Sequence, residues 1–159
     1  MDNISQSIGG PPDGAEATGT VLDEFVSYGL RRASNAVQSD LARALRDIDL
    51  RLVTMSVLVV IAENPGLRQS QLSDILSIER PNLVSILDEL ESRSLMSRTR
   101  VPTDRRAYAL SVTEEGQALA DRALEVTREH EERVFGGLDA ATRRLLRTAI
   151  LQVRFAAGG

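Results

Sequence analysis

Four arginines surround a single proline in the stretch RTRVPTDRRAYALSV, residues 98–112. They are Arg98, Arg100, Arg105 and Arg106, and alternating apolar residues follow them. Arginine side chains are planar, permanently charged and weakly hydrated, so they suit phosphate oxygens and the negative floor of a narrow DNA groove. PTDRR contains proline and aspartate, which are typical of turns. We therefore expect these charges at and near the tip of a β-hairpin, where they can reach a nucleic acid.

The charge of the chain is distributed unevenly, which makes this concentration informative. The 159 residues have a net charge of −4, and all the basic residues are arginine, which we attribute to genomic base composition. Residues 93–106 carry five arginines and one acid, a net of +4, whereas residues 1–24 and 114–133 are acidic. Since the local field governs the choice of partner, an acidic protein can still bind a polyanion through this segment.

Composition excludes several kinds of site. Cysteine is absent, so we expect no disulfide, no thiolate nucleophile and no oxidant sensing through cysteine. His130 is the only histidine, and we expect it to be an exposed helix residue rather than a metal ligand. No nucleophile–base pair and no glycine-rich phosphate loop is apparent, so we do not expect an enzyme. With no long apolar run and no secretory pattern, we expect a cytoplasmic protein without membrane contact, metal or cofactor.

The elements that position the arginines are predicted to be mainly helical. Residues 1–20 lack apolar periodicity and are expected to form a disordered tail. Apolar residues recur every three or four positions from Val21 to Ile48, which predicts one long amphipathic helix whose stripe partly faces another chain. Residues 51–63 are apolar nearly all round and stop at Asn64-Pro65-Gly66, as expected of a buried central helix with a firm terminator.

Two short helices and a hairpin follow the central helix. Leucine and isoleucine residues predict one helix around 72–76 and a second around 83–90, joined by a tight turn, with Pro81 in a first turn where proline is tolerated. Strand-like runs flank the turn PTDRR. Thr113 is expected to cap a helix that continues to about Phe135, and Asp139 to cap a last helix to Phe155.

The segment DRRAYALSVTEEG, residues 104–116, resembles the wing signature of the MarR (multiple antibiotic resistance regulator) family, Asp-x-Arg-x-x-x-Leu-x-Leu-Thr-x-x-Gly. The matching residues are Asp104, Arg106, Leu110, Thr113 and Gly116, with Val112 in place of a leucine. LVSILDELESRSLMSR resembles the family's recognition helix and its exit, with Ser94 where the family usually has glycine and ERPN where small hydroxyl residues are usual. The resemblance spans residues 21–155 and implies a mainly α fold, a winged helix-turn-helix with a two-stranded β-hairpin wing and long N- and C-terminal dimerisation helices.

The resemblance also implies the parts of a single domain, residues 21–157. Residues 21–48 and 139–156 correspond to the dimerisation helices, residues 52–113 to the winged helix-turn-helix, and residues 114–135 to a connecting helix.

Contacts with double-stranded DNA follow from the same resemblance. Arg106 corresponds to the arginine that enters the minor groove, Arg105 is the alternative for that role, and Asp104 either holds the arginine by a charge-assisted bond or only stabilises the turn. The other expected contacts are Asn82 and Ser85 with base edges or phosphate, Arg80 with the backbone or a guanine edge, and Gln69, Ser70 and Arg98 with phosphate.

A regulator that responds to a ligand is the function that the resemblance implies. It implies a homodimeric repressor on a pseudo-palindromic operator, with half-sites about 10 bp apart. A small organic effector, an aromatic acid or an acyl thioester, is expected to release it. Candidate effector contacts are Tyr28, Arg31, Arg32 and Asn35 for a phenolic or carboxylate group, and Met55 for the apolar side.

A different class of function remains open from the sequence. A winged-helix module that binds no DNA would use the arginine-rich hairpin to contact an acidic protein partner. The two functions differ in their dependence on salt, because a DNA-binding protein releases several counterions when it binds.

Overall fold

The computed structural model of this chain describes residues 20–101 and 104–157, without the side chains of residues 101 and 104–107. The chain divides into two compact units, Met1–Asn35 and Ala36–Gly159. In the part of the chain that is described, no helix combines the length and the apolar character needed to cross a membrane.

The first unit contains a short 3₁₀ helix, η1 (Val21–Glu24), and the beginning of α1 (Val26–Leu45). Thr20 caps η1, because its hydroxyl accepts the Leu22 N–H and its own N–H donates to the Asp23 carboxylate at 2.9 Å. The extended backbone of Phe25 (φ −93°, ψ 120°) separates η1 from α1. The prediction of a single helix over residues 21–48 is therefore wrong in detail. The structure forms η1, α1 and a second 3₁₀ turn, η2 (Arg46–Ile48), in this range.

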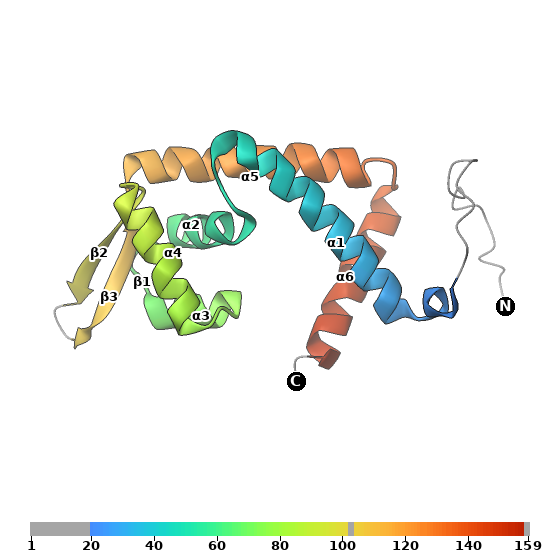
Figure 1. The fold of residues 1–159 in the computed structure, drawn as a ribbon, viewed down its shortest axis with the longest axis horizontal. Coiled ribbons are helices and arrows are strands. Elements are labelled where there is room, and N and C mark those ends of the chain that lie inside the picture. The colour runs from blue at the N-terminus through green and yellow to red at the C-terminus, as the bar shows by residue number, and fades with distance from the viewer. Residues whose placement is uncertain (1–19, 102–103, 158–159) are drawn as a thin grey trace. The chain divides into compact units, whose positions relative to one another are not determined.

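The second unit holds the remaining elements in the predicted order. They are α2 (Leu52–Glu63), β1 (Leu67–Arg68), α3 (Gln69–Leu76), α4 (Arg80–Ser92), β2 (Met96–Val101), β3 (Asp104–Val112), α5 (Glu114–Phe135) and α6 (Ala140–Ala157). Figure 1 shows the sheet where β3 leads into the start of α5, with α3 and α4 next to it. The local signals used in prediction are confirmed, because Pro81 lies in the first turn of α4 and α2 ends just before Asn64-Pro65-Gly66.

The wing belongs to a three-stranded antiparallel sheet in the order β1-β3-β2. Met96 lies opposite Val112 in the hairpin, and Leu67 of β1 lies opposite Leu110 on the other side of β3. The hairpin of β2 and β3 confirms the expected two-stranded wing, and β1 adds a strand that was not predicted. A strand of two residues is too short to give an alternating pattern, so β1 could not be detected from the sequence.

Two apolar clusters hold the second unit together. The larger joins α2, α3, α4, the sheet and α5 through buried residues that include Leu58, Ile61, Leu72, Leu83, Leu87, Leu90 and Leu110. The smaller joins the end of α1 to α5 through Leu45, Leu50, Ala123 and Val126. The helix-turn-helix is thus fixed on a packed scaffold, and α5 contributes to both clusters.

The junction between α4, the wing and α5 depends on Thr113 and Gly116. The Thr113 hydroxyl donates to the Ser94 carbonyl at 2.8 Å and accepts the Gly116 N–H at 3.0 Å, which confirms Thr113 as the cap of α5. A Cβ on Gly116 would lie 1.8 Å from the carbonyl oxygen of Leu95, so only glycine fits there. Ser94 has a φ of +56°, the left-handed conformation that glycine adopts with least strain.

His130 is buried, so the expectation of an exposed residue was wrong. It is 1% exposed and lies four and seven residues after Val126 and Ala123, on the stripe of α5 that faces the smaller cluster. Its Nε2 atom lies 3.4 Å from a carboxylate oxygen of Asp40 on α1.

Candidate nucleic-acid interface

The recognition-helix candidate α4 turns one face to the core and the opposite face outward. Its buried residues are Leu83, Ile86, Leu87 and Leu90. At 100° per residue, the opposite side of the helix carries Pro81, Ser85, Asp88 and Ser92, and all four are exposed. The first two turns of this outer face are uncharged, and Arg80, the only charged residue of these turns, is exposed on the flank of the helix that carries Asp88 and Glu91.

Ion pairs fix one flank of α4 to the start of α2. Glu89 pairs with Arg51, the residue that precedes α2, and also with Arg93 at 3.7 Å. Arg93 in turn reaches the Asp49 carboxylate at 3.3 Å and donates to the Asp49 carbonyl at 3.0 Å. These contacts tie α4 to the turn that connects α1 with α2.

Arg98 fixes the other flank of α4 to the wing. Its guanidinium pairs with Asp88, and its Nε lies 3.5 Å from Glu91, so that one β2 side chain bridges two acids about one turn apart on α4. Only 19% of the Arg98 side chain is exposed. Arg98 therefore has two carboxylate partners on the C-terminal half of α4, and its contact with phosphate stays a prediction.

A groove of about 580 Å³ runs between the start of α2 and the first turns of α4. Its lining includes Arg51 and Val53 on one side and Asn82, Ser85 and Glu79 on the other. The structure thus brings the predicted pair Asn82 and Ser85 together, with the Ser85 hydroxyl donating to the Pro81 carbonyl at 3.3 Å. Sequence reasoning missed Arg51, because an isolated arginine before an apolar helix carries no local signal.

The remaining predicted DNA contacts lie at helix starts and on the wing. Gln69 and Ser70 are the first two residues of α3, with Gln69 half-buried and Ser70 exposed. Arg100 on β2 is exposed. Asp104, Arg105 and Arg106 begin β3, and their side chains lie outside the described part of the structure.

Comparisons with known proteins assign this arrangement to a family. The model of the MarR family matches residues 50–108, from the turn before α2 into β3. A curated protein of Thauera aromatica, described as a putative transcriptional regulatory protein for the hcr operon, is 35% identical over 109 residues, which are 67% of this chain and 66% of that protein. A solved structure of the transcriptional repressor CouR bound to a 23-mer DNA duplex is 35% identical, with a TM-score of 0.79, and the match covers 83% of this chain and 94% of that one. This chain belongs to the MarR family of transcriptional regulators.

This MarR-family chain is also similar to a regulator whose structure was solved with a bound ligand. CouR from Rhodococcus jostii RHA1, bound to p-coumaroyl-CoA, is 29% identical with a TM-score of 0.77, and the match covers 86% of this chain and 96% of that one. The curated relative from Thauera is matched over slightly less than two thirds of its own length.

Four of the predicted effector residues of the MarR-family chain lie in the first unit, and Met55 lies in the second. In the first unit, the guanidinium carbons of Arg31 and Arg32 lie 5.1 and 5.8 Å from the centre of the Tyr28 ring, and Asn35 is exposed. Arg32 also pairs with Asp23 at 3.5 Å. In the second unit, the sulfur of Met55 accepts the Thr127 hydroxyl at 3.5 Å.

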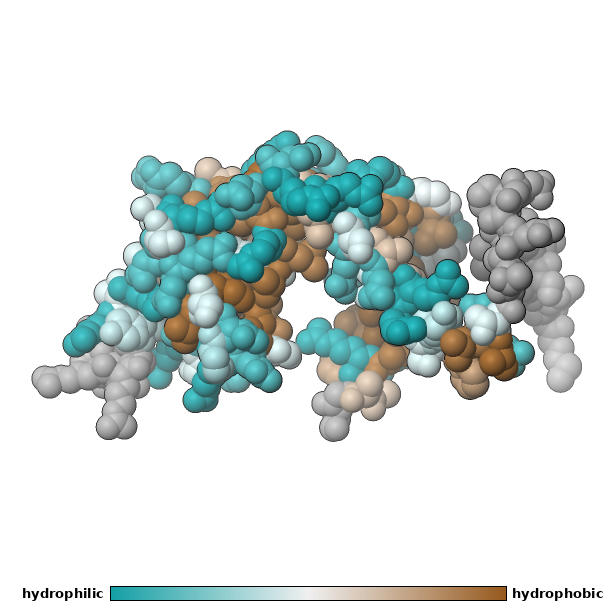
Figure 2. Space-filling model, in the orientation of Figure 1, coloured by the Kyte–Doolittle hydropathy of each residue, from teal (hydrophilic) through white to brown (hydrophobic). Residues whose placement is uncertain are grey.

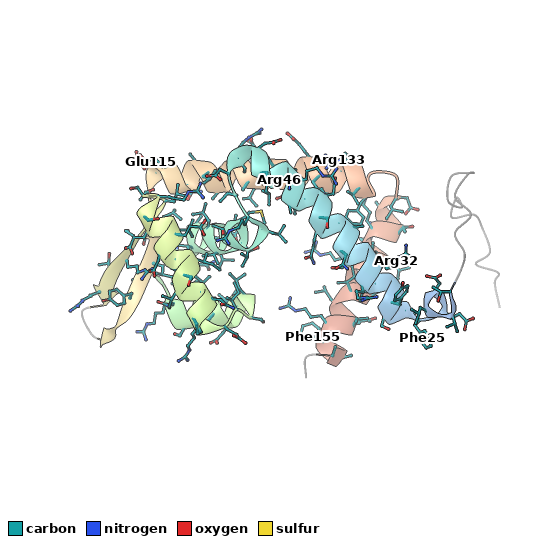
Figure 3. The ribbon with its side chains drawn as sticks, viewed as in Figure 1. Phe25, Arg32, Arg46, Glu115, Arg133 and Phe155 are labelled. Carbon is teal, nitrogen blue, oxygen red and sulfur yellow. The ribbon has the colours of Figure 1, made fainter. Side chains whose placement is uncertain are left out.

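Asp40 connects α1 of the regulator to α5. Its carboxylate accepts a hydrogen bond from Arg133 at 2.6 Å and lies 3.7 Å from Arg43 (Figure 3 labels Arg133). The bond from Arg133 is the main cause that holds the pKa of Asp40 below its ordinary value, and the charges of Arg133, Arg43 and His130 act in the same direction. Among the described residues no group of three or more His, Asp or Glu side chains is placed to hold a metal ion.

Proposed function

We propose that this MarR-family regulator binds double-stranded DNA through α4 and the wing and represses transcription. The observation that carries the proposal is the arrangement of α4, whose first two turns expose Arg80, Asn82 and Ser85 while its acids are paired with Arg51, Arg93 and Arg98. Exposed polar side chains at the start of a helix suit base edges in the major groove. The likeness to a repressor solved on a DNA duplex supports this assignment.

A homodimer is the form in which we propose that it binds. No residue of α6 is buried, and the helix exposes Leu145 (70%) and Phe155 (77%) together with Leu146, Ile150, Leu151 and Val153. In the first unit, the apolar side chains of η1 are also exposed, and Figure 2 shows them as a brown patch at the lower right. Apolar stripes of this kind on terminal helices favour a partner helix from a second copy. A two-fold dimer would then present two copies of α4 to half-sites about one DNA turn apart.

The effector that we propose is an aromatic acyl thioester. CouR from Rhodococcus jostii RHA1 was solved with p-coumaroyl-CoA, and this chain covers 96% of that protein. Binding of such a molecule would weaken the affinity for DNA, and by linkage DNA would weaken the binding of the effector by the same factor.

Fluorescence anisotropy with a labelled duplex from the DNA upstream of its own gene tests the binding function. We expect affinity to fall by about 10³-fold or more between 50 and 200 mM salt, as several phosphate contacts in a dimer require. Binding to an acidic polypeptide but not to the duplex would favour the protein-interaction module instead.

A second titration, with p-coumaroyl-CoA, coenzyme A and p-coumarate added separately to the complex, tests the effector. We expect release of the duplex by the thioester at concentrations where coenzyme A alone leaves the complex intact. Equal release by coenzyme A would contradict a requirement for the acyl group.

A further inference from the structure

The exposed face of α4 carries one large apolar side chain that the core does not use. Val84 is 38% exposed, whereas its neighbour Leu83 is fully buried in the larger cluster. A β-branched residue at an exposed helix position loses rotamer freedom and lowers helix stability slightly. Helix propensity does not account for a valine at this position.

The ion pairs of α4 locate Val84 on the helix surface. It precedes Asp88 by four residues and Glu91 by seven, so the three side chains lie on one flank of the helix. Asp88 and Glu91 both pair with Arg98 of β2, which makes this the flank next to the wing. Val84 is therefore on the wing side of α4, one turn closer to its N-terminus than Asp88 and beside the exposed Ser85.

The opposite flank carries different chemistry. Asn82 precedes Glu89 by seven residues, and Glu89 pairs with Arg51 at the start of α2. Asn82 also lines the groove with Arg51. The first two turns of α4 thus present an amide and a hydroxyl toward α2, whereas the wing flank carries Val84 one turn after the exposed Arg80.

We propose that Val84 is a specificity-determining residue that contacts the C5-methyl group of thymine in the major groove. The inference depends on the DNA-binding function proposed above. The thymine methyl is the apolar group that base pairs display on the major-groove edge, and an apolar side chain distinguishes it without a hydrogen bond. Asn82 and Ser85 form hydrogen bonds and have no preference for a methyl group, so Val84 adds a preference that they do not supply.

The test begins with the full chain and a random duplex library, from which the preferred sequences are selected. In the tightest duplex each thymine is then replaced singly by uracil, which lacks only the methyl group. We expect one thymine in each half-site at which uracil weakens binding about fourfold, as the loss of one buried methyl predicts. Uracil at the other positions should leave the affinity unchanged within twofold.

Two variants connect that effect to Val84. Val84→Ser removes both methyl groups from an exposed position, and serine and valine have similar helix propensities, so folding should be unaffected. We expect this variant to bind the thymine and uracil duplexes equally. Val134→Ser is the matched control, because Val134 is 39% exposed and lies on α5, and it should keep the fourfold ratio.

The possible failures are distinguishable. If no library duplex binds better than random DNA, the proposed function fails at the first step, and the inference fails with it. If sequences are selected but uracil has no effect at any position, DNA binding stands and the role of Val84 is refuted. A fourfold ratio that persists in Val84→Ser also refutes it, because the methyl effect then arises from DNA shape or from another side chain.

Discussion

Single residues at the base of the wing determine how the arginine-rich hairpin is attached to the rest of the fold. Thr113 holds the Ser94 carbonyl and the Gly116 N–H at once, and the missing side chain of Gly116 lets α5 start against the Leu95 carbonyl. The Thr-x-x-Gly of the wing signature is therefore a packing requirement. It contributes to DNA binding by positioning the hairpin.

Gly116→Ala tests this requirement. A methyl group 1.8 Å from a backbone oxygen forces the junction apart, and we expect a loss of about 1–3 kcal/mol in the free energy of unfolding, measured by urea denaturation. Gly29→Ala is the control, because nothing lies within 4 Å of the added methyl on α1. That variant should be neutral or more stable by about 0.5–1 kcal/mol, as expected for glycine to alanine in a helix. Equal stability of Gly116→Ala and the parent chain would mean that α5 does not start as described.

At the scale of elements, charged pairs fix the orientation of the helices. Arg51 and Arg98 clamp the two flanks of α4, and Asp40 joins α1 to α5 through Arg133. The first pairing leaves the start of α4 free to meet DNA. The second links a proposed dimerisation helix to the scaffold of the DNA-binding part.

The Asp40 pairing predicts a dependence of stability on pH. Its pKa is lower in the folded protein than its ordinary value of 3.8, so the carboxylate stabilises the fold above that value. The stabilisation is lost as the pH falls through the lowered folded pKa. Asp40→Asn should therefore melt at a lower temperature than the parent chain at pH 7, and the difference should shrink as the pH falls below 3.8 toward the lowered folded pKa.

Asp47→Asn provides the control for this measurement. Asp47 is exposed on η2, and its substitution by asparagine removes the same negative charge as Asp40→Asn. Its melting temperature should follow that of the parent chain across the range. A constant difference between Asp40→Asn and the parent down to pH 2 would show that the carboxylate charge is not what connects α1 to α5.

The sequence predicted elements well where the signal is local. Pro81, Thr113 and Asp139 each mark a helix start within a few residues of chain, and the Asp139 carboxylate accepts the N–H groups of Ala141 and Thr142 at 2.8 Å as expected. The burial of His130 and the strand β1 were missed. His130 continues the stripe of Ala123 and Val126 on α5, so periodicity did carry a signal for its burial, whereas β1 depends on Leu110, a partner far away in the sequence.

The sequence likewise predicted some parts of the candidate site and missed others. The motif identified the wing and the start of α4, and Asn82 and Ser85 do share a groove. The partners of Arg98 and the role of Arg51 follow only from the fold, because their carboxylate partners, Asp88 and Glu89, are 10 and 38 residues away.

At the scale of the whole molecule, a regulator with a net charge of −4 binds a polyanion only if its positive charge is concentrated on the surface that contacts the DNA. The wing provides that concentration, and a homodimer doubles it. We therefore infer that the wing arginines and α4 of each copy in the proposed homodimer contact one duplex together.

Arg106→Ala, compared with Arg128→Ala on a duplex selected by the parent chain, tests this claim most directly. Arg128 is an exposed arginine of α5, so its removal changes the net charge equally. We predict that Arg106→Ala weakens binding at least about tenfold and lowers the slope of log affinity against log salt by about two, one for each subunit. Arg128→Ala should retain both the affinity and the slope, and both variants should elute at the same volume as the parent chain. Unchanged affinity in Arg106→Ala, or an equal loss in the two variants, would contradict the account.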